Sequence, residues 1–187
     1  EGTITLSGGN ATQTITVKQS GLKEILEKER EALIALYKAT AGDNWTNNEN
    51  WCSDKPVSEW YGVHCTGKRI HSIILYNNNL SGHIPAELGQ LSQLLSIYLC
   101  NNNLTGPIPA ELGQLSKLVV LDFSNNQLSG QIPTELFQLS NLETLELDDN
   151  QFTGPIPVEL IQLSNLKYLY LGSNLFSGAI PETLSNL

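Results

Sequence analysis

A pattern of 24 residues recurs five times in this chain, and it constrains the fold more than any other feature. Residues 77–91, NNNLSGHIPAELGQL, return as NNNLTGPIPAELGQL at residues 101–115. Each copy follows the pattern L-x-x-L-x-L-x-x-N-x-L-x-G-x-I-P-x-x-L-x-x-L-S-x, and the copies begin at Ile70, Leu94, Leu118, Leu142 and Leu166. A period of this length indicates units that stack on one another, because one short unit cannot bury its own apolar side.

The recurring residues predict what each unit contains. Leucines at fixed positions point inward, so that each stacks on the leucine of the next copy. An inward asparagine pairs with backbone groups where the chain leaves the strand, since buried donors and acceptors need partners. Glycine permits tight backbone geometry, and an Ile-Pro pair favours an extended segment. Each copy therefore predicts a short strand, a second extended segment and a short helical turn. The asparagine column consists of Asn78, Asn102, Asn126, Asn150 and Asn174.

The L-x-G-x-I-P variant of the repeat covers residues 70–187 and resembles the plant-type leucine-rich repeats of receptor kinases and polygalacturonase inhibitors. The resemblance implies an α/β solenoid: a right-handed, twisted superhelix with a parallel β-sheet on its concave side. The outward side chains of the strands would then line that concave face.

Residues 21–69 precede the repeats and resemble the N-terminal cap of the same family. Apolar residues at helical spacing predict an amphipathic helix over roughly residues 22–40. A loop and a strand-like segment, WYGVHC at residues 60–65, follow. We interpret the three tryptophans as cap core rather than as a platform for a ligand: Trp45, Trp51 and Trp60.

The same resemblance bears on two cysteines of the cap. In plant members a cysteine pair flanks a Trp-Gly-Val segment, and here Cys52 and Cys65 flank Trp60, Gly62 and Val63. The resemblance implies a Cys52–Cys65 disulfide and therefore an oxidising compartment. The alternative is a pair of reduced, buried cysteines.

Residues 1–20 differ in kind from the rest of the chain. TITL and TITV alternate with period two around a Gly-Gly-Asn turn, which predicts a β-hairpin. The segment GTITLSGGNATQTITVKQ resembles the last two strands of BACON domains, the immunoglobulin-like modules of Bacteroidetes surface proteins. The resemblance implies a bacterial cell-surface or secreted protein, such as an outer-membrane lipoprotein, in which this hairpin is the remnant of an upstream domain.

Composition excludes several classes of partner. The chain has 10 basic and 19 acidic residues and a net charge of −9. Nucleic acids and anionic membrane surfaces need a basic footprint, so neither is expected as a partner. No apolar run approaches the roughly eighteen residues of a membrane helix, so this segment is not expected to insert into a membrane.

Outward residues of successive strands fall into lanes that cross the predicted sheet. One lane reads Ile74, Tyr98, Asp122, Glu146 and Tyr170. Carboxylates gather in the middle of the face, and tyrosines lie on both sides. The candidate ligand-binding residues are Tyr76, Tyr98, Asp122, Glu146, Asp148, Asp149, Tyr168 and Tyr170. Exposed tyrosines beside hydrogen-bonding groups suit a peptide or a sugar. The alternative is a solvated polar face whose tyrosines reflect β-sheet propensity.

The sequence predicts no catalysis, metal or cofactor. Glu146 and Asp148 have a spacing compatible with glycoside hydrolysis, but an open sheet offers no dry pocket that would separate their pKa values. The histidines, His64, His71 and His83, lack the spacing of a metal site. Cys100 has no evident cationic neighbour that would activate its thiol, so we expect it to be inert. One further row of acidic residues belongs to the repeat consensus. We expect these side chains to lie on the surface and to have no functional role: Glu87, Glu111, Glu135 and Glu159.

These observations lead to one functional hypothesis and two alternatives. The first is a non-enzymatic recognition module of an extracellular or cell-surface protein that binds a protein or peptide on the concave face. The second is a carbohydrate-binding module that uses the same tyrosines and acids. The third is a spacer that presents a neighbouring domain.

Overall fold

The computed structural model describes residues 2–8, 11–17 and 20–182. It begins with two antiparallel strands, β1 (Gly2–Gly8) and β2 (Ala11–Val17), so the predicted hairpin is present. Residues 9 and 10 of its predicted turn lie outside the described residues. The helix α1 (Ser20–Ala39) follows, close to the predicted range.

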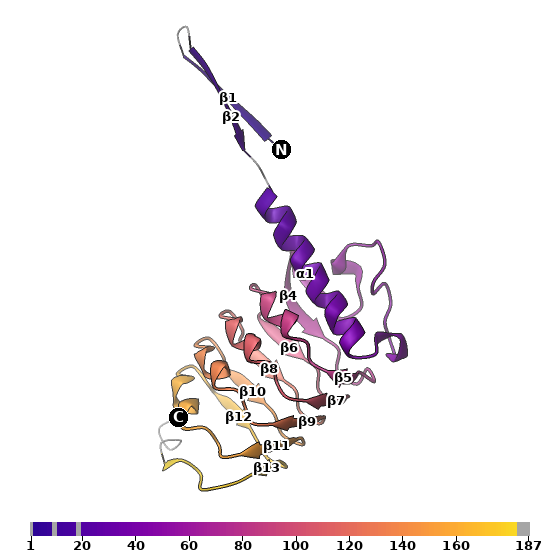
Figure 1. Ribbon diagram of the computed structural model, residues 1–187, viewed down its shortest axis with the longest axis vertical. Coiled ribbons are helices and arrows are strands. Elements are labelled where there is room, and N and C mark those ends of the chain that lie inside the picture. Colours follow the sequence, from indigo (N-terminus) through magenta and orange to yellow (C-terminus); the bar gives the residue numbers. More distant parts are fainter. Residues whose placement is uncertain (1, 9–10, 18–19, 183–187) are drawn as a thin grey trace.

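Two parallel layers of strands run through the repeats (Figure 1). The larger sheet has six strands in the order β12-β10-β8-β6-β4-β3, of which only β3 is antiparallel to its neighbour. Its strands are β3 (Val63–Thr66), β4 (Arg69–Ile74), β6 (Ser96–Tyr98), β8 (Val120–Asp122), β10 (Thr144–Glu146) and β12 (Tyr168–Tyr170). The repeats therefore build the parallel sheet that the family resemblance implies.

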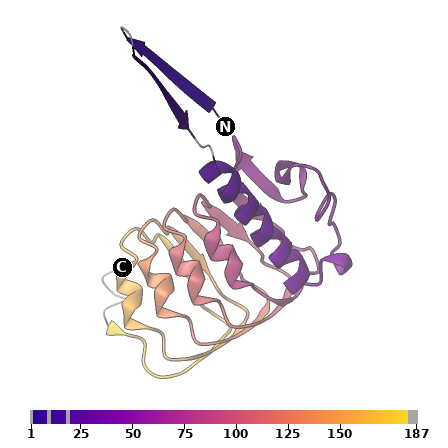
Figure 2. The ribbon, with the colours of Figure 1, turned by 45° about the horizontal axis from the view of Figure 1, so that its top comes forward.

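The second extended segment of each repeat forms a five-stranded sheet. Its strands, in sequence order, are β5 (Ser81–His83), β7 (Asn103–Gly106), β9 (Gln127–Gly130), β11 (Gln151–Gly154) and β13 (Leu175–Phe176). Each repeat then makes a short turn of 3₁₀ helix: η3 (Ala86–Gln90), η4 (Ala110–Gln114), η5 (Thr134–Gln138) and η6 (Val158–Gln162). Figure 2 shows these turns stacked in a row along one side of the solenoid.

The inward leucines form one continuous core. Leu94, Leu118 and Leu142 occupy the same position in three successive repeats, and each is fully buried. Aromatic residues replace leucine at some inward positions, as Phe123 does, without loss of burial. Stacking of each repeat on its neighbour thus removes apolar surface from water that no single repeat could cover.

The asparagine column performs the backbone pairing that its position predicts. The Asn102 amide group donates to the carbonyls of Leu75, Leu99 and Cys100 at 2.9, 2.9 and 3.1 Å. Its Oδ1 accepts from the backbone N–H groups of Asn78 and Leu80 at 3.0 and 2.9 Å. One buried side chain therefore joins two repeats at the bend where regular strand pairing ends.

The cap covers the first repeat with a helix and an aromatic cluster. Trp45, Trp51 and Trp60 are 6%, 6% and 1% exposed, and neighbouring rings meet with centroids 4.8 and 5.1 Å apart. The prediction that they form cap core is confirmed. Gly82 lies under the C-terminal end of α1 with a φ of 111°, where a Cβ would approach the carbonyl oxygen of Ala39 to 2.2 Å.

Candidate functional site

The outward face of the six-stranded sheet carries most of the residues that the sequence predicts as a ligand site. Backbone pairing places Ile74 beside Tyr98, and Tyr98 beside Asp122. It then places Asp122 beside Glu146, and Glu146 beside Tyr170. The register of this lane is as predicted, and adjacent members lie on strands about 4.8 Å apart. We call this surface the sheet face.

Tyrosines on both sides of the sheet face are accessible. Tyr76, Tyr168 and Tyr170 are 52%, 56% and 49% exposed, and Tyr98 is half-buried. Such rings are available to contact a partner with their apolar faces while the hydroxyl group bonds to water or to a ligand.

Asp122, at the end of β8, is only 7% exposed. Its Oδ1 accepts from the backbone N–H of Ser124 at 3.1 Å and from the Ser124 hydroxyl at 2.7 Å. These bonds fold the carboxylate down against the sheet. Asp122 therefore contributes charge to the floor of the face rather than a freely moving side chain.

Glu146, on the next strand, is affected by this buried charge. Burial, followed by the charges of Asp122 and Asp148, raises the pKa of Glu146 above its ordinary 4.5. Asp148 has one carboxylate oxygen that is buried without a hydrogen-bond partner in the described structure. Asp149 belongs elsewhere: it lies in the bend after β10 with a φ of 51°, exposed and outside the lane of Asp122.

No lysine or arginine in the described part of the chain pairs with an acid of the sheet face. Among residues 21–182, no ion pair involves Asp122, Glu146 or Asp148, and none involves Asp149 in the neighbouring bend. After residue 69 the chain has ten acidic residues and only two lysines, Lys117 and Lys167. Lys167 pairs with Glu143 at 2.8 Å, and Lys117 bonds to Gln93. A cationic group from outside would thus find unpaired carboxylates here.

Cys100 lies on the sheet face beside Asp122. Burial of the thiol, followed by its hydrogen bond to Asp122, raises the pKa of Cys100 to about 12. The thiol is therefore protonated at neutral pH, and protonated thiols are poor nucleophiles. This supports the expectation that Cys100 is unreactive.

The structure does not form the disulfide that the family resemblance implies. Cys52 and Cys65 are both free thiols, Cys52 exposed and Cys65 half-buried. Arg30 connects the helix α1 to the cap loop that follows Cys52. Its guanidinium donates to the carbonyls of Ser53 and Lys55 and lies 4.7 Å from the centroid of the Trp60 ring.

A groove of about 450 Å³ beside the asparagine column is a feature that the sequence-based interpretation missed. Its walls are almost entirely amide side chains, including Asn77, Asn101 and Asn125, which share a left-handed backbone conformation. Asn125 donates to Asn101, and Asn103 donates to Asn79 at 3.2 Å. Runs of asparagine in successive repeats were the signal, but the repeat consensus alone accounts for such runs.

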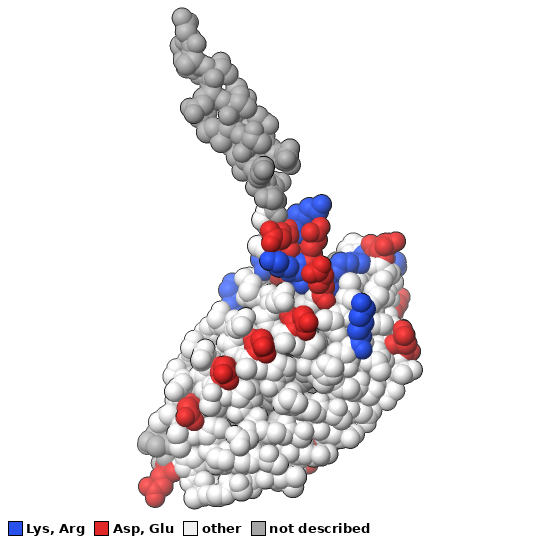
Figure 3. Space-filling view, viewed as in Figure 1, with Lys and Arg blue, Asp and Glu red and all other residues white. Residues whose placement is uncertain are grey.

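The remaining sequence-predicted groups do not assemble into a site. The four glutamates of the repeat consensus lie in the first turns of η3 to η6, where Figure 3 shows a regular row of acidic groups. Among the described residues, no three His, Cys, Asp or Glu side chains gather closely enough to hold a metal ion. The described helices also include none whose length and apolarity would suit a membrane crossing.

Leucine-rich repeat models match this chain at residues 96–152 and again at residues 69–91 and 165–187. The structure is similar to the BIR2 ectodomain from Arabidopsis thaliana, with 34% identity and a TM-score of 0.71 over 81% of this chain and 85% of that one. The chain therefore belongs to the leucine-rich repeat family. No match is found among curated protein sequences.

Two further solved structures are complexes. The BIR3–SERK2 complex from Arabidopsis thaliana is similar at 32% identity and a TM-score of 0.70, over 82% of this chain and 88% of that one. The plant peptide hormone receptor RGFR1, in complex with RGF2, is 45% identical over 60% of this chain, with a TM-score of 0.59. This chain covers only 18% of that receptor.

Proposed function

We propose that this chain is a non-catalytic recognition module of an extracellular or cell-surface protein, and that the sheet face binds a protein or peptide presenting a cationic side chain. The observation that carries the proposal is the set of unpaired carboxylates around Asp122 with accessible tyrosines on both sides. A lysine or arginine of the partner would neutralise the carboxylates, and the tyrosines would cover its aliphatic stem.

Two of the similar solved structures are complexes, and this supports a protein or peptide as the partner. One solved neighbour is the plant peptide hormone receptor RGFR1 in complex with RGF2, and another is the BIR3–SERK2 complex. The bacterial origin and the BACON-like nature of residues 1–20 remain part of the same proposal, and they rest on sequence resemblance alone.

Selection from a library of random displayed peptides tests this proposal. The whole chain is immobilised, and bound peptides are sequenced after washing at low and at moderate ionic strength. We expect enrichment of Lys- or Arg-containing peptides that weakens as salt is raised, because exposed ionic contacts are screened. Enrichment of neutral or acidic peptides, or no enrichment at all, would contradict it. The last result is what a spacer without a ligand would give.

Carbohydrate binding is a second candidate, and the amide groove rather than the sheet face favours it. The groove carries no charge and presents amide donors and acceptors that recur once per repeat. Such groups match the hydroxyl groups of a neutral glycan. A polysaccharide panel tests it with Asn101→Ala and Asn103→Ala together: loss of a saturable signal supports the candidate, and a panel without any signal rejects it.

A further inference from the structure

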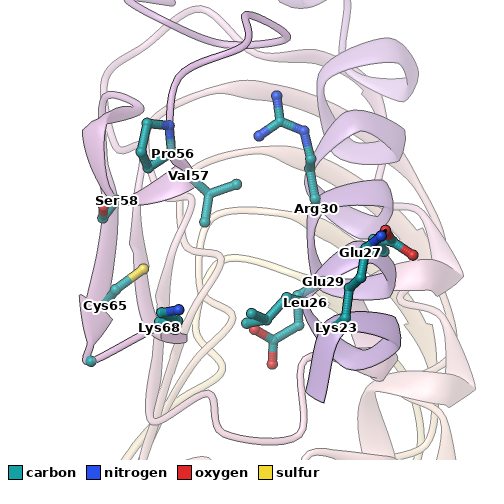
Figure 4. Close-up of a pocket in the computed structure, with 11 residues that line it drawn as sticks. Lys23, Leu26, Glu27, Glu29, Arg30, Pro56, Val57, Ser58, Cys65 and Lys68 are labelled. Atoms are coloured by element: carbon teal, nitrogen blue, oxygen red, sulfur yellow. Dashed lines mark ion pairs between the residues drawn. The ribbon is translucent and has the colours of Figure 1, made fainter. Parts of the chain in front are cut away.

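A cavity of about 360 Å³ lies in the cap, between α1 and the loop that carries the short helical turn η2 (Val57–Glu59). Figure 4 shows Leu26 and Arg30 on the helix side and Pro56 and Val57 on the loop side. Cys65 completes the lining from β3, with its sulfur directed toward the space between them. This cavity is separate from the sheet face and from the amide groove.

The walls of the cavity are mainly apolar, and they continue an apolar stripe of α1. Toward the C-terminal end of the helix this stripe is buried in the core at Leu33 and Leu36. Toward the N-terminal end Leu26 is half-buried, and Leu22 and Ile25 are 50% and 40% exposed. The stripe thus presents apolar surface to solvent beside a cavity, and covering such surface with a ligand is favourable.

Charge at the cavity is positive, although the chain as a whole is strongly acidic. Glu29 is 2% exposed and is neutralised by Arg69, whose Nε lies 2.7 Å from Glu29 Oε1. Arg30 bonds only to backbone carbonyls and to the Trp60 ring, so no acid offsets its charge in the described structure. Lys68, at the rim, takes part in no ion pair among the described residues.

The acids that line the cavity do not reverse this balance. Besides Glu29, the acidic lining residue is Glu27, which pairs with Lys23 at 3.7 Å. Figure 3 shows basic and acidic groups side by side around α1 and the cap, and mainly acidic groups along the repeats. An apolar cavity with an uncompensated positive rim is complementary to a molecule with an apolar body and one negative end.

We propose that the cap cavity binds a small amphipathic anion, an aliphatic carboxylate whose chain lies against Leu26, Pro56 and Val57 and whose carboxylate meets Lys68. The proposal is independent of peptide recognition on the sheet face, because the two surfaces share no residue.

Titration calorimetry of the whole protein with hexanoate, octanoate and decanoate tests whether the aliphatic chain of the ligand is buried in the cavity. Burial of each added methylene should raise the affinity about fourfold until the cavity is filled. Decanol is the control for charge, and it should bind more weakly than decanoate. Absence of saturable binding by decanoate, affinity independent of chain length, or equal binding of decanol and decanoate would each overturn the proposal.

A pair of charge variants tests the role of Lys68. Lys68→Glu should weaken decanoate binding about tenfold or more, because it replaces an attractive charge by a repulsive one at the rim. Lys117→Glu makes the same change in net charge on an exposed lysine of the repeats. It should alter the affinity less than about twofold. Both positions are exposed, so both variants should fold. An equal loss of decanoate affinity in the two variants would show that binding depends only on the net charge of the protein, and it would contradict the assigned site.

The Cys65 thiol reports occupancy directly. In a Cys52→Ser/Cys100→Ser background, Cys65 is the remaining thiol of the chain. Decanoate at saturating concentration should slow its alkylation by N-ethylmaleimide severalfold. Saturable binding with an unchanged alkylation rate would place the anion elsewhere on the molecule and refute the proposal.

Discussion

At the scale of single residues, two adjacent asparagines in one repeat have opposite roles. Asn126 is 8% exposed and donates to the carbonyls of Leu99, Phe123 and Ser124, while its Oδ1 accepts from Leu104. Asn125 is exposed and occupies the left-handed region with a φ of 51°. The Asn126 side chain pairs with buried backbone groups. Asn125 matters mainly because asparagine tolerates the positive φ of the bend.

Asn126→Ala should lower the free energy of unfolding by about 3 kcal/mol, because several buried backbone groups lose their partner. Urea denaturation measures this change. Asn125→Gly is the matched control, since glycine adopts a positive φ without strain, and it should cost less than about 1 kcal/mol. Similar losses in both variants would contradict the distinct role of the inward column.

Glu146 gives the sheet face a pH dependence of defined sign. Its raised pKa means that the folded protein binds this proton more tightly than the unfolded chain does. The charged form therefore destabilises the fold at neutral pH, and this cost disappears as the pH falls through the folded pKa toward 4.5.

Glu146→Gln should therefore be more stable than the parent chain at neutral pH, and the difference should vanish in acid well below pH 4.5. Thermal unfolding across this range measures the difference. Glu111→Gln, on the exposed turns, controls for loss of a carboxylate. A Glu146→Gln variant that is less stable at neutral pH would show that the carboxylate is stabilised rather than strained.

At the scale of elements, the 3₁₀ turns stack closely at the cap end of the solenoid. A Cβ on Gly113 of η4 would lie 2.4 Å from the carbonyl oxygen of Glu135, the glutamate of η5. Gly89 of η3 has the same relation to Glu111. The next repeat carries Phe137 at this position, and that ring is fully buried.

Gly113→Ala should therefore destabilise the protein by about 1–3 kcal/mol, because backbone of the next turn must move to admit the methyl group. Gly172→Ala is its control: no atom lies within 4 Å of the added Cβ. That variant should be within about 0.5 kcal/mol of the parent. Chemical denaturation measures both variants. A Gly113→Ala variant as stable as Gly172→Ala would contradict close stacking of η4 on η5.

The elements that sequence predicts well are those whose residues recur. Periodicity predicts the lane of Tyr98 and Asp122 and the pairing of Asn102, as well as the repeat boundaries. Each copy must stack on the next, so equivalent residues of successive copies lie side by side. The cap loop has no such repetition. The contact of Arg30 with Trp60 and the cavity beside Val57 depend on how a unique loop packs against α1, which no periodic pattern encodes.

Burial of individual side chains on the sheet face was likewise not predictable. Strand alternation places Asp122 on the outward side, as observed, but its burial depends on the Ser124 hydroxyl two residues further on. The free thiols of Cys52 and Cys65 show the limit of family resemblance, since the flanking motif is present and the bond is not.

At the scale of the whole molecule, charge is divided between two regions. Residues 70–187 hold ten acidic and two basic residues, whereas residues 21–69 hold eight acidic and seven basic residues. The sheet face belongs to the acidic region and the cap cavity to the balanced one. The two proposed sites should therefore respond oppositely to ligand charge.

The most direct test of sheet-face recognition is the affinity of the tightest peptide from the display selection for two double variants. Asp122→Asn/Glu146→Gln removes two negative charges from the sheet face, and Glu87→Gln/Glu135→Gln removes two from the outer turns. We predict that the first variant binds the peptide at least about tenfold more weakly, which is about 1.4 kcal/mol, while the second stays within about twofold of the parent. Equal affinity for the first variant and the parent chain would contradict recognition through these carboxylates.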